Sequence, residues 1–410
     1  MLAAMRWTSL GHACWLIEAA GLRLLCDPLL FVEHHGGVFE VSPRRRLRAS
    51  ALRPDFLLIS HRHPDHFDVP SLAALAALDS DTVVVTPDAL VAEAAGALGF
   101  RSVQLVPPGQ RVELDGVRFV TTESLAADEW GVMIATDEGV GWNMVDSVLR
   151  DAAELRAVRD RALAALGHGR VDLALVQGQP MHEIAAQLAQ AIDFPHQRYA
   201  ELLTQLAAID ARAYLPSAAG TVHAPAYAWL NSIVYPVDEG RLRRDLAALR
   251  PEAEIFASEL GARYCVDGRG VALEDGRETE MIERLDGGPS CAYRPVEIPP
   301  LNDLPCSRGV ARGEGEARHT IAAWLEAALR PALAEAYPEF GVDRALRFVV
   351  EVALADERLG ACGETHHDPA HASDRRSLRR ETSQHLAWTL VVDREGATLR
   401  EGFDPDWDCL

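Results

Sequence analysis

Residues 60–66 read Ser60-His61-Arg62-His63-Pro64-Asp65-His66 and directly follow the short apolar run of residues 56–59. An apolar run of this length is typical of a buried strand. Three histidines and one aspartate are costly to bury in a core, whereas a loop at a sheet edge can bring them to one point. His61 and His63 share one side of an extended segment, while Asp65 and His66 can turn toward a second point. The stretch therefore predicts a dinuclear metal site, because imidazole and carboxylate groups can hold two cations that share a bridge.

This His-x-His-x-Asp-His run resembles the metallo-β-lactamase superfamily. Gly11-His12-Ala13 and Asp27-Pro28 support the resemblance, since they are similar to the branch that contains ascorbate-phosphate lactonases and N-acylethanolamine phospholipases D. The resemblance covers about residues 5 to 270 and implies an αββα sandwich with two metal ions at one edge. Early strands with interleaved helices also favour such a sandwich over a doubly wound parallel sheet.

The resemblance implies further ligands at the ends of later strands. Hydrolases of the superfamily place a histidine after the strand that matches residues 117–122, but this chain has no histidine between His66 and His168. Glu123 stands at that place, and Asp146 stands where the bridging aspartate is expected. The implied metal ligands are His61, His63, Asp65, His66, Glu123 and Asp146, with Asp128 and Glu129 as alternatives to Glu123.

Other histidines remain open candidates. We expect His12, with Asp146, to be catalytic and to face the metal pocket, the alternative being a hydrogen bond inside its hairpin. The stretch His34-His35-Gly36-Gly37 is either a loop at the pocket rim or a plain surface loop. The last histidine of the superfamily should follow residues 212–215, where this chain has Pro216-Ser217, and His223 is the nearest imidazole.

The chemical nature of the expected metal ligands indicates which metal and which class of reaction to expect. Histidine-rich sites suit zinc, whereas carboxylate-rich sites favour iron or manganese. Glutamate in place of a neutral imidazole adds negative charge, which stabilises oxidised iron and suits oxygen activation. In this the chain resembles a di-iron oxygenase subgroup typified by the chloramphenicol-biosynthesis β-hydroxylase. The resemblance implies two iron ions, or zinc or manganese, and a substrate that is free or bound to a carrier protein.

We therefore expect an O2-dependent di-iron oxygenase that acts on a small molecule in biosynthesis, with Asp146 bridging the metals. The sequence lacks the paired cysteine–histidine motifs of a Rieske centre, so an oxygenase needs an external electron donor. The alternative is a hydrolase of a lactone, amide or phosphoester that uses a metal-bridging hydroxide.

Composition excludes several other classes. The 61 acidic and 40 basic residues give a net charge of −21, which opposes binding to nucleic acid or anionic membranes. Every basic residue is arginine, so lysine Schiff-base chemistry and the phosphate-binding loop with its lysine are excluded. Seven scattered cysteines, an N-terminus unlike a signal peptide and the lack of a long apolar run favour a cytoplasmic protein.

The chain length predicts more than one domain, since domains typically span roughly 100–200 residues. We expect a catalytic domain over residues 1–285, a linker rich in proline and glycine over residues 286–305, and a smaller C-terminal α+β domain over residues 306–410. The sequence does not indicate the role of that last domain.

Overall fold

The computed structural model describes residues 4–114, 116–178, 181–182, 193–288, 291, 293, 314–337, 344–353 and 385–402. These residues fall into two compact units, of which the first ends at Tyr293 and the second begins at Glu314. Most of the expected linker, residues 286–305, lies outside the described residues. The boundaries 1–285, 286–305 and 306–410 therefore stay a prediction.

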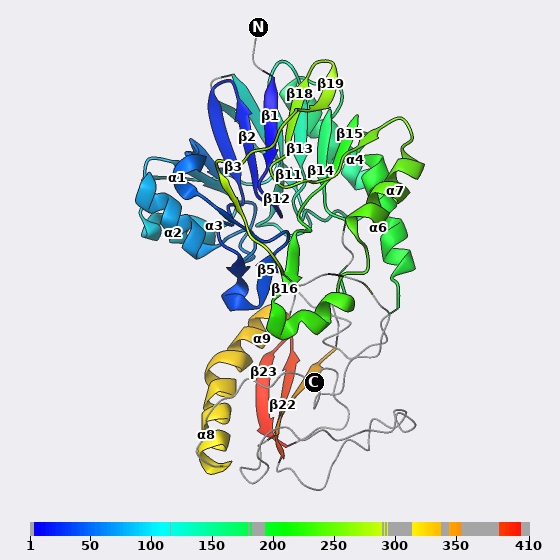
Figure 1. Cartoon of the computed structure of the whole chain (residues 1–410). Coiled ribbons are helices and arrows are strands. Elements are labelled where there is room, and N and C mark those ends of the chain that lie inside the picture. Colours follow the sequence, from blue (N-terminus) through cyan, green and yellow to red (C-terminus); the bar gives the residue numbers. More distant parts are fainter. Residues whose placement is uncertain are drawn as a thin grey trace. The chain divides into compact units, whose positions relative to one another are not determined.

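The first unit contains an eight-stranded sheet with three helices on its outer face (Figure 1). Leu57 and Val84 of the sheet pack against Leu72 and Val91 of two of these helices. In sheet order the strands are β19 (Gly270–Leu273), β18 (Arg263–Asp267), β1 (Met5–Ser9), β2 (Trp15–Ala19), β3 (Leu22–Cys26), β7 (Phe56–Leu58), β8 (Val83–Thr86) and β9 (Ser102–Leu105). The helices are α1 (Ala49–Leu52), α2 (Val69–Leu78) and α3 (Ala89–Leu98).

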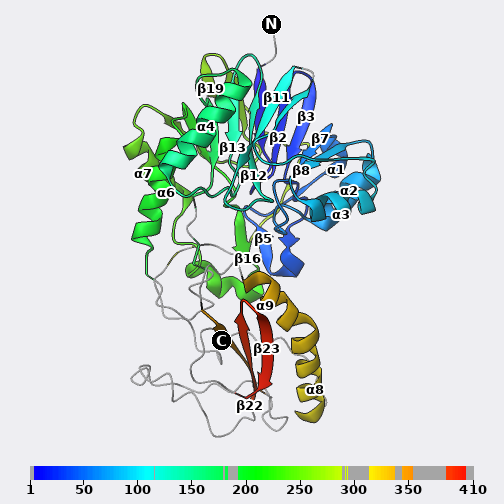
Figure 2. The same cartoon turned by 180° about the vertical axis from the view of Figure 1, so that it is seen from behind.

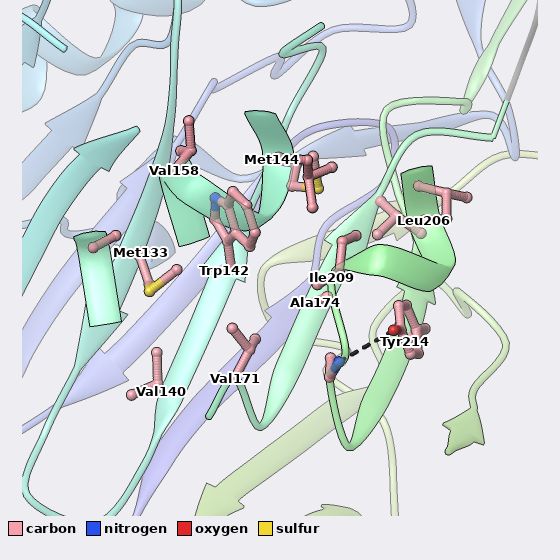
Figure 3. Packing of buried hydrophobic residues seen from close by; sticks show 14 of the residues in the cluster. Met133, Val140, Trp142, Met144, Val158, Val171, Ala174, Leu206, Ile209 and Tyr214 are labelled. Atoms are coloured by element: carbon pink, nitrogen blue, oxygen red, sulfur yellow. Dashed lines mark hydrogen bonds between the residues drawn. The ribbon is translucent and has the colours of Figure 1, made fainter. Parts of the chain in front are cut away.

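A seven-stranded sheet forms the second inner layer, and its own helices cover the opposite face (Figure 2). In sheet order its strands are β10 (Arg111–Leu114), β11 (Val117–Glu123), β12 (Trp130–Ala135), β13 (Val140–Asn143), β14 (Leu173–Val176), β15 (Ala213–Pro216) and β17 (Glu254–Ile255). The helices are α4 (Ala152–Leu166), α6 (His196–Ala208) and α7 (Glu239–Leu249). Trp142 and Tyr214 pack under them with Val158 and Leu206, and the Tyr214 hydroxyl accepts a hydrogen bond from the Ala211 N–H at 3.1 Å (Figure 3).

The core between the two sheets completes an αββα sandwich, as the sequence predicted. Trp7 and Trp15 of the first sheet lie in one buried cluster with Phe119 and Trp130 of the second. Gly141 is required for this packing, because a Cβ there would lie 2.3 Å from the Trp7 ring. The two sheets therefore approach each other closely at this point of the core.

Two small sheets lie beside the sandwich in the first unit. One consists of β4 (Glu33–His34), β5 (Phe39–Val41) and β16 (Thr221–His223), with the 3-10 turns η1 (His35–Gly37) and η2 (Pro225–Ser232) next to it in sequence. The other pairs β6 (Arg45–Leu47) with β20 (Ile282–Arg284). These two small sheets hold loops that lie next to the candidate site.

The second unit is a small α+β structure, in agreement with the expected class of the C-terminal domain. Its described elements are α8 (Glu314–Trp324), the π-helical turn η4 (Leu325–Leu329), α9 (Arg330–Ala336), β21 (Leu346–Ala353), β22 (His385–Asp393) and β23 (Gly396–Glu401). The three strands form one antiparallel sheet, on which Leu325 packs against Trp388 and Leu390. Across the described part of the whole chain, no helix has the length and apolar character needed to cross a membrane.

Candidate metal centre

The histidine run follows β7, a strand that pairs in parallel with β3 and β8 in the middle of the first sheet. A tight turn shapes the run, since the His66 N–H donates to the His63 carbonyl at 2.9 Å. The second sheet meets this place, because the Trp130 N–H donates to the Ser60 carbonyl at 3.3 Å. Both sheets therefore deliver side chains to one edge of the sandwich.

Two groups of potential metal ligands lie at this edge. His61 and His63 lie with Asp146, and Asp65 and His66 lie with His12, which places five of the six predicted ligands in the two groups. The Nε2 atom of His66 is 3.2 Å from Asp146 Oδ2 and 3.4 Å from Asp65 Oδ2. Asp146 thus reaches both groups, which is the arrangement expected of a bridging carboxylate.

Outer hydrogen bonds orient the imidazoles. Asp27 accepts one bond from His66 Nδ1 at 3.0 Å and another from the Ser60 hydroxyl at 2.8 Å. Since that hydroxyl donates to Asp27, it accepts from His61 Nδ1, which lies 2.9 Å away. His61 and His66 are thus each held through Nδ1, which leaves the Nε2 atom of both rings directed toward the two groups, as is usual for a histidine ligand supported by an outer hydrogen bond.

The electrostatics of the site fit bound cations. His66 Nε2 is buried and makes no hydrogen bond to any described residue, although two carboxylates face it. Burial alone would lower the pKa of His66, but Asp65 and Asp146 raise that pKa well above its usual value. Burial lowers the pKa of His61 to about 3, which keeps its imidazole neutral and able to coordinate. The two carboxylates that raise the pKa of His66 would equally attract a metal cation, and the neutral imidazole of His61 is able to coordinate one.

Glu123 does not join either group, in contrast to our prediction. It is the last residue of β11, and its carboxylate accepts a hydrogen bond from Arg161 of α4 at 2.7 Å. Asp128 is likewise paired, with Arg62 at 2.7 Å. The structure therefore turns both of these carboxylates toward arginines rather than toward the histidines.

Glu129 is the carboxylate of this loop that faces the centre. Only 9% of the residue is exposed, and its carboxylate accepts a hydrogen bond from the Ser124 hydroxyl at 2.7 Å. Burial raises the pKa of Glu129, and the nearby Asp146 raises it further. The sequence had offered Glu129 only as an alternative, because it lies six residues beyond the strand position that the resemblance indicated.

His12 faces the centre as a hydrogen-bond donor. Its Nδ1 accepts from the Gly220 N–H at 3.2 Å, and a backbone N–H can only donate. A neutral imidazole then carries its proton on Nε2, which lies 3.2 Å from Asp65 Oδ2. His12 therefore presents an N–H to the centre, and the hydrogen bond to its other nitrogen comes from Gly220 rather than from within its own hairpin.

His223 lies outside both ligand groups. Its Nδ1 donates to the Asn231 side-chain oxygen at 3.1 Å, and its ring packs against Phe39. Ser217, which stands near the position expected for a last histidine, accepts a hydrogen bond from Trp15 Nε1 at 2.9 Å. Neither residue is placed to bind metal here.

Backbone strain is concentrated at the centre. Among the described residues, eight that are not glycine have a left-handed φ, and His12, Asp27, His35 and Val145 are four of them. Val145, with a φ of 52°, directly precedes Asp146, and its N–H donates to the Asn143 side chain. A β-branched residue seldom adopts this conformation, and such strain is common where a site holds side chains in fixed positions.

Arg45 ties together two of the loops that support the centre. Its side chain is fully buried, and it donates to the carbonyls of Leu10 and Leu29, each at 2.6 Å. Leu10 lies two residues before His12, and Leu29 lies two residues after Asp27. Burial lowers the pKa of Arg45 to about 10, so the guanidinium stays charged at neutral pH.

Replacing Arg45 should therefore loosen this part of the molecule. Arg45→Met leaves the two buried carbonyls without donors, and we expect the free energy of unfolding to fall by about 2–4 kcal/mol. Urea unfolding followed by tryptophan fluorescence measures this change. The neighbouring Arg46 is exposed, so Arg46→Met is the matched control and should unfold like the unmodified protein. Equal midpoints for the two variants would contradict the role given to Arg45.

Comparisons with known proteins agree with the fold. A family model described as a β-lactamase superfamily domain matches residues 6–152. The chain is 31% identical over 186 residues to a UPF0173 metal-dependent hydrolase of Pyrobaculum calidifontis, and the match spans 43% of this chain and 76% of that relative.

Two further proteins that are similar to the chain have names that refer to redox proteins. The chain is 38% identical over 85 residues to a putative Rieske 2Fe-2S iron-sulfur protein of Mycobacterium tuberculosis, a match that spans 20% of this chain and only 16% of that relative. Among solved structures, CmlA, a diiron β-hydroxylase from Streptomyces venezuelae, is 17% identical with a TM-score of 0.42, over 65% of this chain and 55% of CmlA.

The matched region coincides with the elements that build the site. The family model begins within β1 and ends where α4 starts, so it includes the histidine run and Asp146. Because one relative also aligns over three quarters of its own length, the chain belongs to the metallo-β-lactamase superfamily of metal-dependent enzymes.

Proposed function

We propose that the protein is a hydrolase with a dinuclear metal centre. The observation that carries this proposal is the convergence of His66 Nε2 with the carboxylates of Asp65 and Asp146, beside the N–H of His12. The relative from Pyrobaculum, which is named a metal-dependent hydrolase, supports the same reaction class. Lactones, amides and phosphoesters are the substrate classes that we propose.

The ligand groups suggest how two ions would be held. His61, His63 and Asp146 would hold one ion, and Asp65, His66 and Asp146 would hold the other. Bound ions would supply Lewis-acid chemistry, by polarising a carbonyl or phosphoryl oxygen and by lowering the pKa of a water molecule. The metal could be zinc, manganese or iron.

Two further side chains have roles in this proposal. His12, held by Gly220, would donate its Nε2–H to the substrate oxygen that gains negative charge. Glu129, whose pKa is raised by burial, would take up a proton during bond cleavage and release it to the leaving group. Both roles are supported by proximity, since His12 Nε2 lies 3.2 Å from Asp65 Oδ2 and the charge of Asp146 acts on Glu129.

An O2-dependent oxygenase is the second candidate, and the carboxylate content of the site favours it. Only three imidazoles stand beside Asp65 and Asp146 among the expected ligands, and Glu129, outside both ligand groups, is a further carboxylate near Asp146. Such a donor set suits iron. The mycobacterial relative is named an iron–sulfur protein, which is consistent with redox chemistry. An oxygenase would act on a small molecule, free or carrier-bound, and would need an external electron donor.

One experiment separates the two candidates. Full-length protein is loaded with zinc, manganese or iron, and its metal content is measured. Each form is then given 4-nitrophenyl acetate, a simple γ-lactone or bis(4-nitrophenyl) phosphate, with and without oxygen. We expect two ions per chain and equal hydrolysis in the presence and absence of oxygen, because hydrolysis consumes no oxidant.

The contrary result would be recognisable. If the zinc and manganese forms are inert while the iron form consumes oxygen in the presence of a chemical reductant, the oxygenase replaces the hydrolase. Removal of the ions with a chelator should abolish either activity and re-addition should restore it, which controls for a contaminating enzyme.

A further inference from the structure

We propose that His35 binds the substrate directly, by donating a hydrogen bond to an anionic oxygen at the metal centre, and that His34 fixes the tautomer of His35 that can do so. The inference rests on the proposed function and narrows its substrates to molecules that carry a carboxylate or phosphate oxygen near the scissile bond. It concerns residues outside both ligand groups.

The backbone brings His35 back toward the centre. His35, Gly36 and Gly37 have φ values of 50°, 63° and 87°, so three successive residues adopt the left-handed conformation. As a result, His35 Nε2 lies 4.0 Å from Asp65 Oδ1, while His12 Nε2 lies 3.2 Å from the other oxygen of the same carboxylate. Two imidazoles thus approach Asp65 from the chain's N-terminal loops.

His34 controls the proton of His35. The two Nδ1 atoms are 2.8 Å apart, so one of them must carry the proton of a hydrogen bond. His34 is 3% exposed, its ring stacks on Phe39, and its Nε2 has no hydrogen-bond partner among the described residues. Burial lowers the pKa of His34 to about 3, so this histidine is neutral and carries a single ring proton.

The two possible positions of the shared proton differ in free energy. If His35 Nδ1 held the shared proton, His34 Nε2 would carry a buried N–H without an acceptor, and His35 would direct a lone pair at the Asp65 carboxylate. If His34 Nδ1 holds it, His34 keeps only an unpaired lone pair and His35 directs an N–H at that carboxylate. The second state avoids both an unsatisfied donor and a repulsive contact, and is therefore favoured.

The N–H of His35 is available to a ligand. A separation of 4.0 Å from Asp65 is too long for a hydrogen bond, and 30% of the His35 side chain is exposed. An oxygen bound here would also lie near the donor of His12 and near the expected cations. Positive charge and two N–H donors together select an oxygen that carries negative charge.

Binding of simple anions tests this inference without a known substrate. Metal-loaded full-length protein is titrated calorimetrically with inorganic phosphate and, separately, with acetate. We expect His35→Phe to weaken binding of the preferred anion by about tenfold, which is the effect of losing one charge-assisted hydrogen bond. His35→Gln should retain most of the affinity, since its amide supplies an N–H, and both variants should keep two ions per chain.

Two more variants complete the design. His34→Phe preserves the stacking on Phe39 but removes the control of the tautomer, so its affinity should fall between those of the unmodified protein and His35→Phe. His196→Phe changes an exposed histidine at the start of α6 and should bind anions normally. A preference for phosphate or for acetate would indicate phosphoester or carboxylate substrates.

The outcomes that overturn the inference are distinct from failure of the hydrolase proposal. Unchanged affinity in His35→Phe, or loss of a metal ion from that variant, would show that His35 does not act as a substrate donor. Failure of the unmodified protein to bind either anion would overturn the inference as well. Hydrolysis of the neutral ester 4-nitrophenyl acetate could still occur in that case and would leave the proposed reaction class intact.

Discussion

Asp146→Asn is expected to remove at least one of the two metal ions and to abolish activity. Asp146 is the residue that both ligand groups share, since it lies with His61 and His63 and its Oδ2 is 3.2 Å from His66 Nε2. Loss of an outer-shell partner typically costs roughly 10- to 100-fold in metal affinity, so loss of a shared ligand should cost about 100-fold or more. Metal analysis after equilibrium dialysis measures the change.

The amide preserves the shape of the side chain, so the fold should survive. Asp137→Asn is the matched control, because Asp137 is an exposed carboxylate paired with Arg118 at 2.9 Å, outside both ligand groups. Circular dichroism should be the same for both variants and for the unmodified protein. If Asp146→Asn retained two ions with unchanged affinity, Asp146 would not bridge the metals and the assignment of the centre would be wrong.

The sequence was sufficient to predict the sandwich and most of the centre because the decisive signals are local. The histidine run and the strand before it lie within eleven residues. Polar residues that directly follow a buried strand have few positions other than a loop at the edge of the sheet. Asp146 was found for a related reason, since it follows β13 after only two residues. In both cases the strand that positions the ligand is its immediate neighbour in sequence.

The carboxylate at the end of β11 shows where reasoning from neighbouring residues fails. Glu123 stands at the expected position, but Arg161, 38 residues later, draws its carboxylate toward α4. The loop after β11 then returns Glu129 to the centre, where Ser124 holds it. No pattern of neighbouring residues reveals which carboxylate a loop turns inward, because the pairing depends on a helix that is packed from elsewhere in the chain.

The supporting residues were missed for the same physical reason. Arg45 lies among other arginines in the sequence, and only the fold shows that it is buried on the carbonyls of Leu10 and Leu29. The role of His35 depends on three left-handed residues and on a contact with its neighbour His34. Glycine at positions 36 and 37 was the available sign that this loop adopts an unusual backbone.

Glu129→Gln should strongly reduce turnover while leaving metal content unchanged. Glu129 is 9% exposed, and burial first and Asp146 further raise its pKa, which makes its carboxyl a better proton donor and acceptor than an exposed glutamate. General acid–base catalysis by a positioned carboxyl typically contributes about 100-fold or more, and glutamine cannot replace it. Steady-state turnover of the best ester or lactone substrate, together with metal analysis, gives both quantities.

Glu123→Gln is the control that makes this result decisive. It removes the ion pair with Arg161, whose partners are both partly exposed, and such pairs contribute at most about 1 kcal/mol. Turnover and metal content should therefore match those of the unmodified protein. If instead Glu123→Gln lost a metal ion and Glu129→Gln did not affect turnover, Glu123 would be a ligand after all. The carboxylate-rich, iron-binding centre of an oxygenase would then be the better description, because Glu123 at the end of β11 would supply an anionic ligand to the metals.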